Sequence, residues 1–179
     1  MQSNLHEIFP LDDIIGHSTP PSQRVYVRFM KTSEEMLTEL FDREAIRELP
    51  VRYCDCVWQG NLEAMLDLFA ANAAFISKGR QREAVSRGRD ELRAMYQKAL
   101  GDFTPRPYIH NHVVDLRGKN KATGRCYVEL RSASRGMEWI GTGFYEDEYV
   151  KEGEQWKFAS RKFTSFAMQP PPASNAAKS

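Results

Sequence analysis

An acid and a histidine in this sequence have the side chains that general acid–base chemistry requires. Asp55 lies in an aromatic and cysteine-rich segment, where an unpaired buried charge would cost on the order of several kcal/mol, so it needs a partner or water. A carboxylate hydrogen-bonded to an imidazole fixes the tautomer of the ring and raises its basicity. Asp55 and His110 are therefore a candidate pair for removing a proton near neutral pH.

Polar and aromatic residues on the neighbouring segments are candidates for the lining of a pocket. Each has a common structural role as well, because tyrosines and phenylalanines on sheets usually pack in the core, and an arginine is usually a solvated or paired surface residue. The polar candidates are Tyr53, Tyr127, Glu129, Tyr145 and Arg161, and the apolar candidates are Trp58, Phe75, Trp139, Phe144 and Phe163.

The segment around His110 also contains His112. Strict strand alternation would place Tyr108, His110, His112 and Val114 on one face. A His-x-His pair can bind a metal, yet no third ligand stands at helpful spacing, so we expect no metal site. The alternative for either histidine is a neutral ring that is hydrogen-bonded inside the sheet. We expect His112 to contribute to substrate binding.

The elements that must position these residues begin with helices. Thr32 and Glu35 have capping-box spacing and predict a helical segment over 33–41. Asp42 is then expected to cap a longer amphipathic helix that carries Tyr53 and Asp55, and Pro50 predicts a kink or a break in it. Tyr53 and Asp55 are two positions apart, about 200° around the helix axis, so both enter one pocket only if the helix is distorted.

The later part of the chain changes from helical to alternating periodicity. A second short helix and a strand beginning near Ala73 precede a polar loop or irregular edge over 79–89, and a third helix is predicted over 90–100. Four long strand candidates follow from Pro107, separated by glycine-containing turns, and predict an antiparallel meander. Helices first and a long sheet afterwards indicate an α+β fold with the helices on one face of the sheet.

Composition narrows the classes of partner. The 179 residues include 25 basic and 24 acidic side chains, a net charge of +1, which gives no electrostatic argument for nucleic acid or an anionic membrane. The three cysteines form no CxxC pair, so we expect no disulfide framework or zinc site. No apolar run reaches membrane-spanning length, and the first residues lack the pattern of a signal peptide. We expect a soluble cytoplasmic protein with a small hydrophobic partner.

The ends of the chain differ from its middle in composition. Residues 1–32 read as an N-terminal arm, with a possible short strand over 23–31 whose partner could belong to a second subunit. Residues 170–179 (PPPASNAAKS) are too polar and proline-rich to pack and read as a disordered tail.

The order of these segments resembles the SnoaL-like branch of the nuclear transport factor 2-like superfamily. The resemblance rests on AIRELPVRYCDCVWQGNLEAMLDLFAANAAF, GRDELRAMY, YIHNHVVDL, ATGRCYVEL and GTGFYEDEYVKEGEQWKFASRKF, which together cover roughly Glu44 to Phe166. It implies a cone-shaped α+β barrel over 33–169, in which a curved, mostly antiparallel sheet carries three helices from the N-terminal half. It also implies a homo-oligomer, either a dimer or a trimer.

The resemblance has functional implications as well. Tyr53, Asp55 and His110 are similar to residues of dehydrochlorinase-type, scytalone dehydratase-like and bile-acid dehydratase-like lyases, which implies cofactor-independent elimination, isomerisation or cyclisation of a hydrophobic ring or polyketide-like substrate. In that mechanism His110, oriented by Asp55, removes a proton, and Tyr53 stabilises the developing oxyanion or leaving group. Ser77 stands where ketosteroid isomerases place their base carboxylate, so that mechanism is disfavoured. The alternative is a non-catalytic ligand-binding or scaffold protein, such as the small subunit of ring-hydroxylating dioxygenases.

Overall fold

The computed structural model describes residues 9–10, 26–27, 31–78 and 83–169. The chain divides into two compact units, residues 1–40 and residues 41–179. In the first unit, β1 (Phe9–Pro10) pairs antiparallel with β2 (Tyr26–Val27). Of the strand predicted over 23–31, Tyr26 and Val27 pair within the same chain, and residues 23–25 and 28–30 lie outside the described residues. Most of the predicted arm and the whole of the predicted tail, residues 170–179, lie outside the described residues.

Helix α2 (Ser33–Gln59) is a single continuous helix. The predicted capping box is confirmed: the Glu35 backbone N–H donates to Thr32 Oγ1 at 3.1 Å, and the Thr32 N–H donates to Glu35 Oε2 at 2.7 Å. The predicted second helix start at Asp42 is wrong, because Asp42 Oδ1 accepts hydrogen bonds from Lys151 Nζ and Trp156 Nε1 instead, each at 2.8 Å. The helix also continues without a break through Pro50.

Two further helices and two strands lead to the meander. Helix α3 (Leu62–Asp67) is capped by Asn61, whose Oδ1 accepts from the Ala64 N–H at 3.1 Å. Strand β3 (Phe69–Lys78) begins earlier than predicted, and β4 (Glu83–Arg87) forms the edge expected to be irregular. Helix α4 (Gly88–Phe103) contains the third predicted helix. Its Arg89 and Arg93 pair with the acidic side chains Glu63 and Asp67 of α3.

The remaining strands confirm the meander. They are β5 (Pro105–Leu116), β6 (Lys121–Ser132), β7 (Glu138–Glu152) and β8 (Gln155–Met168), with the 3-10 turn η2 (Ala133–Arg135) before β7. Successive strands pair antiparallel, and β3 joins the other edge of β8 in parallel. The order of the six-stranded sheet is therefore β4-β3-β8-β7-β6-β5.

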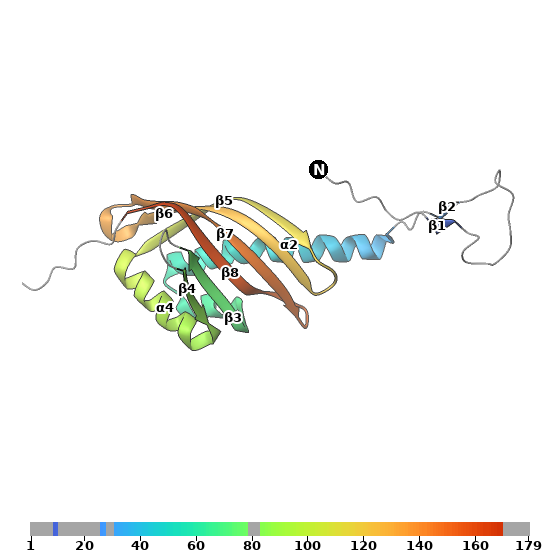
Figure 1. The fold of residues 1–179 in the computed structure, drawn as a ribbon, viewed down its shortest axis with the longest axis horizontal. Coiled ribbons are helices and arrows are strands. Elements are labelled where there is room, and N and C mark those ends of the chain that lie inside the picture. The colour runs from blue at the N-terminus through green and yellow to red at the C-terminus, as the bar shows by residue number, and fades with distance from the viewer. Residues whose placement is uncertain (1–8, 11–25, 28–30, 79–82, 170–179) are drawn as a thin grey trace, which may run out of the picture. The chain divides into compact units, whose positions relative to one another are not determined.

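The helices and the sheet form two layers around one core in the second unit. Figure 1 shows the curved sheet on one side and α4 with the C-terminal part of α2 on the other. The buried face of α2 carries Ile46, Leu49, Tyr53 and Val57, which pack against buried sheet residues such as Phe158. Because this burial is what holds amphipathic helices on a sheet, the predicted α+β fold with helices on one sheet face is confirmed.

Candidate functional site: an apolar cavity above a buried arginine

An inner cavity of about 350 Å³ lies between α2, α4 and the inner face of the sheet. Ligand sites in proteins are usually concavities of about 300–1,000 Å³ with mainly apolar walls and a few polar groups, and this cavity has both properties. Its lining comprises Tyr53, Val57, Phe75, Ser77, Met95, Tyr96, Lys98, Ala99, Leu100, Pro105, Pro107, Leu130, Ile140, Tyr145, Phe163 and Met168.

Three buried tyrosines supply most of the polar groups of this lining. Tyr53 comes from α2, Tyr96 from α4 and Tyr145 from β7, and each is at most 5% exposed. The ring centroid of Tyr53 lies 6.0 Å from that of Tyr96 and 6.1 Å from that of Tyr145. Burial raises the pKa of all three phenols, against the opposing charge of Arg161. All three hydroxyls are therefore neutral at pH 7 and able to donate a hydrogen bond.

Arg161 on β8 lies directly behind two of these rings. Its guanidinium carbon is 4.1 Å from the Tyr145 ring centroid, 4.4 Å from that of Tyr53 and 4.3 Å from that of Phe158. Arg161 is completely buried, so its interpretation as a surface residue is wrong. Arg161 is inward-facing because it pairs with Asp147, which lies on the same face of β7 as the buried Tyr145.

The charge of Arg161 is balanced by Asp147 on β7. Arg161 Nε and Nη2 donate to the two carboxylate oxygens of Asp147, each at 2.9 Å. Burial opposes the charged guanidinium, yet the adjacent Asp147 carboxylate holds the pKa of Arg161 well above its usual value. The third nitrogen, Nη1, is buried and has no hydrogen-bond partner among the described residues. The Tyr96 hydroxyl is unpartnered in the same sense.

A chain of hydrogen bonds continues from Asp147 to His112. The Tyr149 hydroxyl donates to Asp147 Oδ2 at 3.0 Å, and its oxygen lies 3.1 Å from His112 Nε2. Since the Tyr149 proton is used toward Asp147, His112 is the donor to Tyr149 and carries its proton on Nε2. Burial lowers the pKa of His112, although the Asp147 charge opposes this. His112 is therefore a neutral, hydrogen-bonded ring on the inner face of the sheet. It does not line the inner cavity, so its role in substrate binding stays a prediction.

The predicted pair of Asp55 and His110 is not formed in this structure. Both residues are exposed, neither lines the cavity, and no hydrogen bond or ion pair joins them. Asp55 lies about 200° around the axis of α2 from Tyr53. Because Tyr53 lines the cavity and α2 is continuous, Asp55 lies on the outside of the helix. Their catalytic role stays a prediction without support from the geometry.

A β-bulge explains the position of His110. Ile109 pairs with Val128, and His112 pairs with Cys126. The segment of β5 between these two pairs therefore contains one residue more than the segment of β6 that it faces. The extra residue reverses the alternation, which leaves Tyr108 and His110 exposed while His112 and Val114 face the interior. The prediction that these four residues share one face is therefore wrong.

The predicted pocket-lining residues divide between the two faces of the sheet. Phe75 and Phe163 line the cavity, as predicted. Trp58 is 37% exposed and its Nε1 donates to the Pro107 carbonyl at 2.9 Å. Outside the cavity lie Tyr127 and Phe144, whose rings contact each other and Phe166, together with Glu129, which pairs with Arg131, and Trp139.

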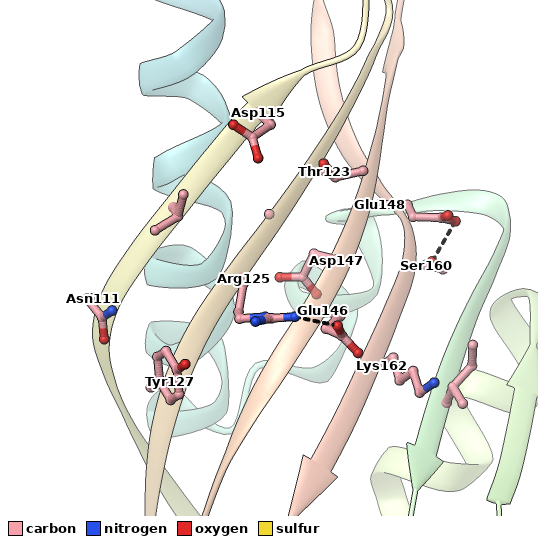
Figure 2. A pocket seen from close by; sticks show the side chains of 13 residues that line it. Asn111, Asp115, Thr123, Arg125, Tyr127, Glu146, Asp147, Glu148, Ser160 and Lys162 are labelled. Atoms are coloured by element: carbon pink, nitrogen blue, oxygen red, sulfur yellow. Dashed lines mark hydrogen bonds and ion pairs between the residues drawn. The ribbon is translucent and has the colours of Figure 1, made fainter. Parts of the chain in front are cut away.

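The outer face of the sheet carries a second and more polar concavity of about 690 Å³. Figure 2 shows its side chains on β5 to β8, including Arg125, whose Nη2 donates to Glu146 Oε1 at 2.8 Å. Ser160 Oγ likewise donates to Glu148 Oε2 at 2.9 Å (Figure 2). Charged and polar side chains make up a larger share of this lining than of the inner cavity's, so the inner cavity suits a small hydrophobic ligand better.

Sequence reasoning missed Tyr96, Asp147 and Tyr149 as site residues. A signal for the last two was present, because Tyr145, Asp147 and Tyr149 stand at period two on one strand. An acid between two tyrosines on an inward face must be paired. Nothing in the sequence names Arg161 as that partner.

Neither a metal-binding cluster nor a membrane-spanning helix is found among the described residues. In that part of the chain, no three His, Cys, Asp or Glu side chains are grouped so that they could hold a metal ion. None of the described helices is long and apolar enough to span a membrane. Burial raises the pKa of Cys54 and Cys126 to about 12, so these two thiols are poor metal ligands and nucleophiles.

Together the fold and the cavity define a class of protein: a curved sheet and helices that enclose an apolar ligand site. Residues 38–162 match the SnoaL-like domain family, and because the match covers most of the chain, the protein belongs to this family. Its resemblance to the SnoaL-like branch is thereby confirmed. A comparison with curated protein sequences finds no significant match.

Solved structures with the same fold include three informative neighbours. A variant of a Mycobacterium tuberculosis protein of unknown function is 25% identical, with a TM-score of 0.65 over 78% of this chain and 79% of that one. A candidate scytalone dehydratase from Novosphingobium aromaticivorans is 20% identical, with a TM-score of 0.62 over 80% and 99%. A hexachlorocyclohexane dehydrochlorinase from Novosphingobium barchaimii is 18% identical, with a TM-score of 0.65 over 77% and 94%. The last two likenesses establish the fold.

Proposed function

We propose that this protein is a cofactor-independent lyase or isomerase that acts on a small hydrophobic ring or polyketide-like substrate in the inner cavity. One observation carries the proposal: Tyr53 and Tyr145 line an apolar cavity with the buried guanidinium of Arg161 directly behind their rings. The fold relatives named as dehydratase and dehydrochlorinase support a lyase more than another class of enzyme.

The tyrosines would act on an oxygen of the substrate. When a proton leaves the carbon next to a carbonyl, negative charge grows on the carbonyl oxygen, and a neutral phenol that donates to this oxygen stabilises it. Tyr96 is the best placed donor, because its hydroxyl is buried in the lining and has no hydrogen-bond partner within normal distance among the described residues. The charge of Arg161 behind two of these rings is already paired with Asp147, so the stabilisation comes from the neutral phenol hydroxyls.

The identity of the base is a separate question. The predicted base, His110 oriented by Asp55, lies outside the cavity, so the proposal assigns the stabilisation of charge to Tyr53, Tyr96 and Tyr145 and does not depend on His110. A requirement for His110 would mean that the β5 bulge changes when substrate binds.

The proposal is tested with 2-naphthol, an aromatic compound whose fluorescence distinguishes the neutral phenol from the naphtholate. A site that stabilises a developing oxyanion binds naphtholate preferentially and lowers the pKa of the bound compound. We expect Tyr96→Phe to weaken naphtholate binding about tenfold, the effect of one hydrogen bond to a charged group. The measurement is a fluorescence titration of each variant from pH 6 to pH 10.

His110→Ala and Asp55→Asn serve as the matched controls, since both side chains are exposed outside the cavity. We expect both controls to bind naphtholate like the unmodified protein. Equal binding by Tyr96→Phe and the unmodified protein would contradict the proposal, and a loss confined to His110→Ala would restore the predicted dyad.

A non-catalytic ligand-binding or scaffold role is the second candidate. The observation in its favour is that none of the described residues lining the cavity is an Asp, a Glu or a His, the usual bases of proton abstraction. Preferential naphtholate binding without turnover of any dehydration or isomerisation substrate would favour this role. Formation of a trimer only with a larger iron-containing subunit would favour the scaffold form of it.

A further inference from the structure

Lys98 on α4 is the one charged side chain among the described residues that line the inner cavity. It makes no hydrogen bond or ion pair with another described residue, in contrast to Lys151, which is held by Asp42 at 2.8 Å. An ammonium group at the edge of an apolar concavity attracts an anion most when no carboxylate of the protein already neutralises it. No carboxylate of a described residue therefore neutralises the charge of Lys98.

The position of Lys98 is at the solvent end of the cavity. Lys98 is exposed and Met168 is 41% exposed, whereas Tyr53, Tyr96 and Tyr145 at the inner end are at most 5% exposed. A ligand that fills the cavity thus has one end near the tyrosines and the other near Lys98. The lining also includes Met95 and Leu100, and both are apolar.

We infer that the ligand is an amphipathic anion, with an apolar body in the cavity and a carboxylate at the mouth beside Lys98. This inference rests on the proposed use of the inner cavity as the substrate site and adds the charge of the substrate to it. The oxygen that the tyrosines would bind is at the opposite end of the same ligand. Lys98 is accordingly a residue that determines specificity and has no part in the chemical step.

The inference is tested by changing the charge of the probe and of residue 98. The three probes have a similar shape and are 2-naphthylacetate, 2-naphthylethanol and 2-naphthylethylammonium. We expect the unmodified protein to prefer the carboxylate over the alcohol about threefold, the size of an exposed ion pair, and to lose this preference at high salt. Lys98→Met should abolish the preference, and Lys98→Glu should transfer it to the ammonium probe. Each dissociation constant is measured by naphthyl fluorescence.

Three further variants locate the probes and separate the outcomes. Lys119→Met removes an exposed lysine in the β5–β6 turn, away from the lining, and should change nothing. Ala99→Trp adds a large side chain to the cavity lining and should abolish binding of all three probes. If Lys98→Met keeps the carboxylate preference while Tyr96→Phe loses it, the anion binds at the inner end and this inference is overturned.

The proposed function can fail independently. Binding of the alcohol without any preference for the carboxylate overturns the role of Lys98 and leaves the cavity as the substrate site. Binding of no probe by the unmodified protein, or binding that Ala99→Trp leaves intact, overturns the use of the cavity itself and with it the proposed function.

Discussion

Asp147 and Arg161 form an ion pair in which both side chains are completely buried. Removing two charges from water is costly, and the pair is tolerable only because two hydrogen bonds of 2.9 Å join it and three aromatic rings surround the guanidinium. Arg161 Nη1 nevertheless has no partner among the described residues. Such an unsatisfied donor costs stability that a ligand oxygen or a water molecule can restore.

Asp147→Asn should destabilise the fold strongly, by about 3–5 kcal/mol, because it leaves the buried Arg161 charge without its counter-ion. The matched control is Glu146→Gln on the same strand, where the pair with Arg125 is about half exposed and its loss should cost less than about 1 kcal/mol. Urea unfolding followed by tryptophan fluorescence measures both changes. Equal and small losses for the two variants would show that the buried pair is dispensable.

His112 should make stability depend on pH. Burial lowers the pKa of the folded-state ring, with Asp147 opposing and Arg161 and Arg47 assisting, while the unfolded ring titrates near its ordinary pKa of about 6.5. As pH falls below that value, the unfolded chain binds a proton that the folded chain does not, so the free energy of unfolding decreases. His112→Gln removes this group and should flatten the stability profile between about pH 6.5 and pH 5. An unchanged slope in urea titrations over this range would exclude His112 as its source.

At the scale of single elements, α2 and β5 illustrate what local sequence determines. The phase of α2 was predictable, because apolar spacing fixes which helix face is buried, and this places Tyr53 inside and Asp55 outside. The bulge in β5 was not predictable from β5 itself. The bulge lies between the pair Ile109–Val128 and the pair His112–Cys126, so it depends on the neighbouring strand β6. Because of this bulge, His112 faces the interior and His110 does not.

Strand β7 depends on a glycine where it approaches β8. An added Cβ on Gly143 would lie 2.3 Å from the Thr164 carbonyl oxygen and 2.7 Å from Phe163 Cε2. We expect Gly143→Ala to destabilise the protein by about 1–3 kcal/mol, the usual cost of forcing extra atoms into a packed core. The bulky neighbour Phe163 lines the cavity, so ligand binding should weaken as well.

Gly101→Ala is the control for this substitution, because Gly101 lies in α4 and an added Cβ there meets nothing within 4 Å. This change should stabilise the protein by about 0.5–1 kcal/mol, since alanine favours a helix over glycine. Thermal unfolding of both variants measures the contrast. A neutral Gly143→Ala would mean that the two strands can separate at this position without loss.

At the scale of the whole molecule, the α+β fold and the meander of four strands followed from the change of periodicity along the chain. The parallel pairing of β3 with β8 could not be predicted in this way, because the two strands are far apart in sequence and neither carries a local signal for the other. The same limit applies to the site. Tyr53, Phe75 and Phe163 were identified by residue type, whereas the burial of Arg161 follows from Asp147 on another strand.

The pairing of β3 with β8 has a consequence for how the polypeptide is made. The ribosome releases α2, α3, β3 and α4 well before β8. Until β8 is released, the sheet is incomplete and the apolar faces of the helices stay exposed. Asp147 likewise emerges before Arg161 and cannot be buried until its counter-ion arrives. Non-local pairing of this kind slows folding and leaves incomplete chains prone to aggregation. Nascent chains that stop before β8 should therefore be clients of chaperones, and the cavity can form only after β8 has been released.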